Sequence, residues 1–233
     1  MKKVAIMQPT FFPWLGYFSL LNAVDEFIFL DDVQFEKRSW QQRNRIKISD
    51  ELRWLTIPVN SKGKYDQIIN DVTLIESQKH KNNILKTIYH TYNKSKNFEK
   101  IYSELELVVL TETDKLVEFN IGFIDFVCKL LKINTILTKS SSLNCAGMKD
   151  ERLVNICILL SSKHYIAPPG SEQYIVEGNH FNENKIKVSY FYYEHPIYHQ
   201  LGKNFISHLS ILDLIMNEEI QNIINYLNLY KLK

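Results

Sequence analysis

The stretch that decides the fold is Val4–Phe35, VAIMQPTFFPWLGYFSLLNAVDEFIFLDDVQF. A first apolar run, Val4–Met7, is followed by two prolines, a helical stretch that begins near Gly16, and a second apolar run, Phe27–Leu30. The order strand, loop, helix, strand predicts the first unit of a parallel α/β sheet. In such sheets ligands bind beyond the carboxyl ends of the strands.

Polar and aromatic side chains follow both predicted strands, where such a site would lie. The residues that we expect to bind substrate here are Gln8, Pro9, Trp14, Gly16, Tyr17 and Gln34. Two adjacent carboxylates, Asp31 and Asp32, end the second strand and are candidate catalytic residues. They could hold a ribose, a sugar hydroxyl, an amine or a magnesium ion. Because neighbours in an extended chain point to opposite sides, we expect one to face the site and the other to cap a turn.

The rest of the chain continues the α/β pattern. Further strands are predicted at Arg53–Val59, Ile68–Ile75, Asn134–Leu137, His164–Ala167 and Ile186–Phe191. About three helices are predicted between residues 78 and 132, one at Asp150–Leu160, and a helical region at Leu209–Leu229. We therefore expect a single α/β domain over residues 1–233, with three layers, a mostly parallel, nucleotide-binding-like sheet and a helical insertion at about 78–132.

Composition limits the function classes. The 233 residues are 45% hydrophobic and 12% aromatic, which supports a packed core, and the net charge of +2 does not indicate a generic nucleic-acid binder. Three cysteines without CxxC spacing predict neither a disulfide framework nor a structural zinc site. Cys145 is the one cysteine in a polar loop, but the sequence pairs it with no base. The start MKKVAIM is not typical of a signal peptide, and no apolar run reaches the length of a membrane span, so we expect a cytoplasmic protein without membrane insertion.

A basic segment, Phe35–Lys47, follows the second strand. Its candidate substrate-binding residues are Lys37, Arg38, Trp40, Arg43, Asn44 and Arg45. Arginine binds phosphate or carboxylate in a bidentate manner, and tryptophan stacks on a base, so the segment is suited to a nucleoside diphosphate. The alternatives are a solvated basic loop, or contact with RNA, because single-strand binding proteins also interleave basic and aromatic residues.

The loop before the first helix, with the pattern P-x-x-G-Y at Pro13–Tyr17, resembles the H-x-G-H loop of nucleotidylyltransferases. Phe12 or Pro13 and Tyr17 stand where that loop has histidines. A glycine at a helix start permits close approach of an anion. The alternative is a packed aromatic turn in which Gly16 is a plain bend.

The C-terminal region supplies a candidate general acid or base. His195 follows the last predicted strand and is assigned the catalytic role, with Tyr198 and Gln200 as substrate-binding residues. Pro196 argues against a helix that would bring His195 and His199 together on a metal. Ser210 and Asp213 have the spacing of a capping box, which gives Asp213 a structural role.

Three long motifs resemble the WbqC-like proteins. They are IMQPTFFPWLGYF, DDVQFEKRSWQQRNRI, and the tail segments HPIYHQ and FISHLSILDLIMN. The resemblance covers nearly the whole chain. It implies a role in bacterial surface polysaccharide (O-antigen) synthesis, because members lie among such genes. It also implies a glycine (aminoacyl) transferase that acts on an amino sugar.

An enzyme of that kind must bind a nucleotide-linked sugar, deprotonate its amine and hold an acyl donor. If free glycine is the donor, ATP with Mg²⁺ is needed to activate it; if aminoacyl-tRNA is the donor, the basic segment gains a second use. A nucleotidylyltransferase and a non-catalytic partner of a glycan-biosynthesis enzyme are the alternative functions. The oligomeric state stays open.

Overall fold

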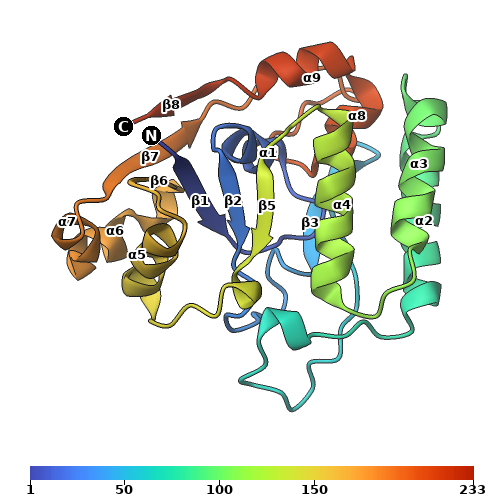
Figure 1. The fold of residues 1–233 in the computed structure, drawn as a ribbon. Coiled ribbons are helices and arrows are strands. Elements are labelled where there is room, and N and C mark those ends of the chain that lie inside the picture. Colours follow the sequence, from blue (N-terminus) through green and yellow to red (C-terminus); the bar gives the residue numbers. More distant parts are fainter.

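The structure is a computed structural model that describes residues 1–233, with the side chains of all residues except Pro169 and Tyr174. A six-stranded sheet forms its centre (Figure 1). Its strands are β1 (Lys3–Met7), β2 (Glu26–Phe29), β5 (Ile136–Lys139), β6 (His164–Ala167), β7 (Lys187–Tyr193) and β8 (Tyr230–Leu232). They lie in the order β5-β2-β1-β6-β7-β8, and every pair is parallel except β7–β8.

Helices cover both faces of the sheet. They are α1 (Leu15–Asn22), α2 (Ser77–Tyr92), α3 (Phe98–Leu110), α4 (Leu116–Leu130), α5 (Lys149–Leu159), α6 (Glu172–Gly178), α7 (His180–Glu183), α8 (Ile211–Asn217) and α9 (Ile220–Tyr226). Side chains of β1 alternate between the faces: Ala5 packs in the core with α1, α4 and α8, whereas Val4 and Ile6 pack with α5 and α7. The expected three-layer α/β architecture with a mostly parallel sheet is therefore confirmed.

The strand order reverses at β1. The first half of the chain builds outward from β1 through β2 to β5, and the second half builds in the other direction through β6 to β7. In open α/β sheets this reversal opens a crevice beyond the carboxyl ends of the strands. Met7 ends β1 at this point, and Ala167 ends β6.

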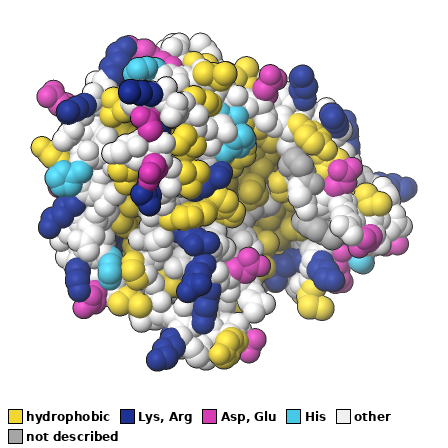
Figure 2. Space-filling view, turned by 180° about the vertical axis from the view of Figure 1, so that it is seen from behind, with side chains coloured by type: hydrophobic (Ala, Val, Ile, Leu, Met, Phe, Trp, Pro, Cys, Tyr) yellow, Lys and Arg dark blue, Asp and Glu magenta, His cyan; other side chains and the backbone are white. Residues whose placement is uncertain are grey.

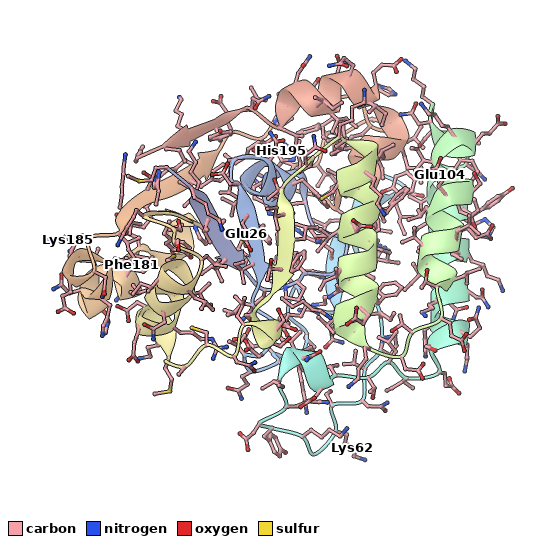
Figure 3. All side chains as sticks on the ribbon, viewed as in Figure 1. Glu26, Lys62, Glu104, Phe181, Lys185 and His195 are labelled. Carbon is pink, nitrogen blue, oxygen red and sulfur yellow. The ribbon has the colours of Figure 1, made fainter. Side chains whose placement is uncertain are left out.

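The segment between β2 and β5 holds the elements that are not part of the main sheet. It contains an antiparallel hairpin, β3 (Arg43–Ile48) with β4 (Glu51–Thr56), a short 3₁₀ helix, η1 (Ile69–Asp71), and then α2, α3 and α4. The three helices lie in the range that the sequence predicts. Lys62 lies in the loop that projects from the molecule after β4, and Glu104 lies on α3 (Figure 3).

Some predicted elements are wrong. Ile68–Ile75 is not a strand: it contains η1 and only isolated bridges, Gln34–Ile68, Val59–Leu74 and Thr73–Lys115. Three apolar side chains of this segment, Ile69, Val72 and Leu74, are buried, but its backbone pairs with three separate segments instead of one strand. The opposite error is β3 (Arg43–Ile48), a strand that the sequence analysis does not predict and that lies almost wholly in the basic segment Phe35–Lys47. Two short 3₁₀ helices, η2 (Ser140–Ser142) and η3 (Pro169–Ser171), follow β5 and β6.

No helix in the described part of the chain is long and apolar enough to cross a membrane.

Candidate functional site

Two adjoining cavities lie beside the carboxyl end of β1, where the strand order reverses. Met7, Trp14 and Tyr17 line both, so these side chains form their common wall. The first cavity, of about 260 Å³, is completed by Thr10, Trp40, Asn44, Arg45 and His208. The second, of about 210 Å³, is completed by Gly16, Leu20, Pro168, Phe191, Tyr192 and Tyr193. Figure 2 shows a hollow on one face, with hydrophobic side chains inside it, a histidine at its margin and a column of Lys and Arg side chains below it.

Side chains from distant elements hold the loop between β1 and α1. The Asn44 amide on β3 donates to the carbonyls of Phe11 (3.1 Å) and Phe12 (2.9 Å), and Phe12 has a left-handed backbone with φ of 43°. The Asn120 amide on α4 donates to the carbonyl of Pro9 at 3.1 Å. In the same loop, the Gln8 side chain accepts a hydrogen bond at 2.8 Å from the Gln41 amide. Gln8, Pro9 and Asn44 therefore shape the wall of the site.

The glycine at the start of α1 is covered by an aromatic ring. A Cβ added to Gly16 would lie 2.2 Å from Cη2 of Trp14. The close approach that Gly16 permits is therefore to this indole. The Tyr17 hydroxyl donates to the Gln8 carbonyl at 3.2 Å, and burial raises the pKa of this phenol well above its ordinary value.

His195 stacks on Trp14, with ring centres 6.2 Å apart and planes inclined by 7°. Its Nδ1 donates to the Pro196 carbonyl at 2.8 Å, and its Nε2 accepts the backbone N–H of His208 at 3.1 Å. Burial, assisted by His208, lowers the pKa of His195 to about 4. The imidazole is thus neutral at neutral pH with both nitrogens occupied, an arrangement that suits orientation of the loop better than proton transfer. In Figure 3 His195 lies beside α1, well away from Phe181 of α7.

His208 was not singled out from the sequence, although it stands in the tail motif FISHLSILDLIMN. It lines the first cavity, its backbone is left-handed with φ of 57°, and its carbonyl accepts a hydrogen bond from Arg45 at 3.2 Å. Burial and then the charge of Arg45 lower the pKa of His208. Among the described residues, none hydrogen-bonds to its ring nitrogens, so a lone pair is available to a ligand.

The remaining lining of the first cavity is aromatic and basic. The Arg45 guanidinium lies 5.2 Å from the ring centre of Trp40, which is 46% exposed, and Thr10 contributes a hydroxyl. The described lining includes no Asp or Glu side chain. This cavity therefore suits a ligand with an anionic group and a planar ring.

The two predicted catalytic carboxylates lie elsewhere along the sheet. Asp31 is buried and accepts hydrogen bonds from the Ser141 backbone (2.9 Å) and hydroxyl (2.7 Å) and the Ser140 hydroxyl (3.1 Å). Asp32 accepts from Ser140 at 2.5 Å and forms an ion pair with Arg152. Asp31 thus fixes the turn after β5, and Asp32 is partly exposed. The structure brings both together with serines and an arginine, and not with His195.

A third cavity adjoins this cluster. Its volume is about 300 Å³, and it is lined by Leu30, Val33, Lys149, Arg152 and Leu153. Cys145 lies near Arg152, and burial raises the pKa of its thiol, although Arg152 acts in the opposite direction. This environment does not favour the thiolate that a nucleophilic cysteine needs. The described residues contain no group of three or more His, Cys, Asp or Glu side chains placed to hold a metal ion.

Four other predicted substrate-binding residues line none of these cavities: Gln34, Lys37, Arg38 and Arg43. Gln34 donates to the Tyr65 carbonyl at 2.9 Å, Lys37 lies over the Tyr65 ring, and Arg38 is exposed on the same outer loop. Trp40 and Arg45 are at the first cavity, and Arg43 lies on the outer side of the hairpin.

Tyr198 and Gln200 are buried in a network behind the cavities. The Tyr198 hydroxyl donates to Asp213 at 2.9 Å, and the Gln200 side chain bonds to the Ile206 backbone N–H and carbonyl, both at 2.9 Å. Ser210 caps α8 by accepting from the Leu212 N–H, while the Asp213 carboxylate faces Tyr198 and does not complete the expected capping box.

Comparison with known proteins agrees with the three motifs. The profile of the WbqC-like protein family matches residues 8–225. A curated protein of Mycobacterium tuberculosis (strain ATCC 25618 / H37Rv), named "Uncharacterized protein Rv1507c", is 38% identical over 219 residues, which are 93% of this chain and 94% of that protein. No solved structure matches the chain. The chain belongs to the WbqC-like protein family.

Proposed function

We propose that this protein is a transferase that binds a nucleotide-linked amino sugar in the cavities beside Trp14 and acylates the sugar amine. The observation that carries the proposal is the first cavity, where Trp40, Arg45 and His208 converge without an acidic side chain, and where burial and the charge of Arg45 lower the pKa of His208. Together the two cavities fall within the range of small-molecule sites, about 300–1,000 Å³. Their place at the reversal of the strand order, 3-2-1-4-5 in chain order, is where doubly wound folds bind nucleotides.

Each residue of the first cavity would have its own role in such a reaction. Trp40 would stack on the base, and Arg45 would bind the diphosphate through its guanidinium. His208 would take a proton from the sugar ammonium, because its ring nitrogens have no partner among the described residues. The freed amine attacks the acyl carbonyl, the amide bond forms, and the leaving group departs with the electron pair of the broken bond and a proton. The biological setting that the family suggests is surface-polysaccharide synthesis inside a bacterial cell.

The first experiment is a thermal-shift panel with nucleotide amino sugars, ATP with Mg²⁺, and glycine, singly and together. A ligand at 100 times its Kd adds about 2.7 kcal/mol to the free energy of unfolding. A shift with a nucleotide sugar, followed by an acylated product in mass spectrometry, is the expected result. A shift with ATP alone would instead support the adenylating or nucleotidylyl-transferring alternative, and no turnover together with a stable protein complex in pull-down would support a non-catalytic partner.

A matched pair of variants tests the proposed base. His208→Asn should lower kcat by about 10²- to 10⁴-fold, the usual range for loss of a general base, with little change in fold. His199→Asn is the control, because His199 is exposed and lines neither cavity beside Trp14. Equal activity of the two variants would remove His208 from the reaction.

A further inference from the structure

The β3–β4 hairpin presents a row of basic and aromatic side chains to solvent. The two strands pair with Arg45 opposite Trp54. Because side chains alternate along a strand, the inward positions Asn44, Ile46 and Leu55 are buried, and Arg43 shares the outer face with Arg45 and Trp54. Trp40, from the turn before β3, lies against this face.

Four of these side chains contact one another in a row, with the two tryptophan planes inclined by 47°, and we name them the Arg–Trp ladder: Arg43, Trp54, Trp40 and Arg45. The Arg43 guanidinium lies 4.3 Å from the Trp54 ring centre, the two tryptophan rings are 5.2 Å apart, and Arg45 lies 5.2 Å from Trp40. Trp40 is 46% exposed and Trp54 is 45% exposed. Large aromatic rings that remain half exposed and side by side are typical of a binding surface.

The charge of the ladder is not neutralised within the protein. In the described part of the chain no ion pair includes Arg43 or Arg45. The acids nearest in sequence on the hairpin are engaged elsewhere, Asp50 with Lys47 and Glu51 with Arg53. The Nε atoms of both ladder arginines are buried and have no hydrogen-bond partner, so a ligand would be bound by the terminal nitrogens of the guanidinium groups. The ladder can therefore accept an anionic ligand without breaking an existing ion pair.

We propose that the Arg–Trp ladder binds single-stranded nucleic acid, with consecutive bases stacked on the tryptophans and backbone phosphates bound by the arginines. A nucleotide-linked sugar has one base, which Trp40 alone could stack, whereas the ladder offers a second platform outside the cavity lining. Exposed aromatic rings with cations beside them can bind the bases and the phosphates of a single strand. Trp40 and Arg45 also line the first cavity, so one end of a bound strand lies at that cavity. This inference does not depend on the transferase activity.

The direct test is a binding titration, followed by fluorescence anisotropy, with labelled oligouridine and oligothymidine octamers and with unlabelled UMP as competitor. We expect the octamer to bind at least ten-fold more tightly than UMP, because two stacking platforms are used. The logarithm of affinity should fall with the logarithm of salt concentration with a slope near −1.4, about −0.7 for each of two phosphates. The tighter of the two octamers identifies RNA or DNA as the ligand. No binding, or equal affinity for UMP and octamer, would overturn the proposal.

Variants locate the binding surface. Trp54→Ala should weaken octamer binding by roughly 5- to 150-fold, the fold-change that corresponds to loss of one stacked base. Trp54→Tyr should keep most of the affinity, and Leu52→Ala, on the same strand and also exposed, should keep all of it. Arg43→Gln should reduce the salt slope by about 0.7, whereas Arg53→Gln, whose arginine already pairs with Glu51, should not.

Folding of each variant is checked by its circular dichroism spectrum and Tm. If Trp54→Ala does not fold, Arg43→Lys replaces it, because lysine keeps the charge and loses the planar stack. Full octamer affinity in a folded Trp54→Ala or Arg43→Lys variant would show that the strand binds elsewhere.

Discussion

The indole of Trp14 lies over Gly16, so close that a Cβ at residue 16 would meet three ring carbons at 2.2, 2.4 and 2.7 Å. This contact sets the position of the wall shared by the two cavities. It also explains the glycine near the start of a buried helix, where alanine would otherwise be favoured by about 1 kcal/mol.

We therefore expect Gly16→Ala to displace Trp14 and to destabilise the protein, because inserting one carbon into a packed site costs about 1–3 kcal/mol. For a chain of this length the Tm should fall by roughly 2–4 °C for each kcal/mol. Tryptophan fluorescence should change with it, since the stack of Trp14 on His195 is disturbed.

The matched control is Gly122→Ala on α4. This glycine is also helical, but a Cβ there would meet no atom within 4 Å. Its substitution should leave the Tm unchanged or raise it, by the helix propensity of alanine. Similar losses in both variants would mean that the Trp14 contact does not constrain residue 16.

Much of the main sheet follows from local sequence, and the hairpin does not. The strand at His164–Ala167 was predicted with its observed bounds, because an apolar run between turn signals is a local pattern. The β3 strand was missed because charged residues such as Arg43, Arg45 and Lys47 are typical of a solvent-exposed loop. In the structure Asn44 and Ile46 on one face of β3 are buried. Lys47 is also buried, and its ammonium contacts Asp50 and the distant Asn204 carbonyl.

The sequence predicts where a site would lie in the sheet, but it does not show which side chains meet there. The loop after β1 was correctly placed at a strand end, and Trp14, Trp40 and Arg45 do meet at one cavity. Their partner His208 comes from a loop more than 150 residues later, and its place at the cavity depends on contacts that no local pattern encodes. For Asp31 the sequence suggests a catalytic role, because two carboxylates are adjacent. The structure shows instead that serine hydroxyls donate hydrogen bonds to this carboxylate.

His195 should titrate far below an ordinary histidine. Its pKa is lowered to about 4 by burial and by His208, while the unfolded chain takes up the proton near 6.5. Between these values the unfolded state binds more protons, so His195 contributes stability that grows as pH rises from 4 to 6.5 and is lost on acidification. The check is an NMR titration of the imidazole, together with denaturant unfolding of His195→Gln, in which this part of the pH dependence should be missing. A His195 titration near 6.5 would contradict the buried, neutral ring.

The contribution of Asp213 to stability should change with pH in the opposite direction to that of His195, over a similar pH range. Burial raises its pKa to about 6, although hydrogen bonds, among them that from Tyr198, partly oppose the shift. The folded state then binds the proton more tightly than the unfolded state, so stability from this group is full below about pH 4 and is lost as pH rises through 6. The free energy of unfolding of Asp213→Asn, compared with that of the natural protein, should therefore increase between pH 4 and pH 7. The expected increase is about 3 kcal/mol, at 1.36 kcal/mol per pKa unit. Denaturant midpoints at the two pH values measure this difference, and a constant difference would contradict it.

The turn of the hairpin holds the loop that carries His208. The Asp50 carboxylate accepts the backbone N–H groups of Lys203 (2.8 Å) and Asn204 (3.2 Å) and the Lys47 ammonium (3.0 Å). Gly202 makes this approach possible: its φ is 92°, and a Cβ there would lie 2.3 Å from the Asp50 carboxylate.

We expect Gly202→Ala to break these contacts and to shift His208 away from the first cavity. The NMR signals of the His208 imidazole and the fluorescence of Trp14 should both change, because the two rings are 5.1 Å apart. Gly63→Ala is the control, since Gly63 also has a positive φ, 73°, but a Cβ there would touch nothing within 4 Å. Both substitutions place an alanine in the left-handed conformation, which costs about 1–2 kcal/mol. A loss of stability that both variants share therefore reports backbone strain alone. A change in the His208 and Trp14 signals that appears only in Gly202→Ala reports the link from the hairpin turn to the cavity, and identical spectra for the two variants would show that no such link exists.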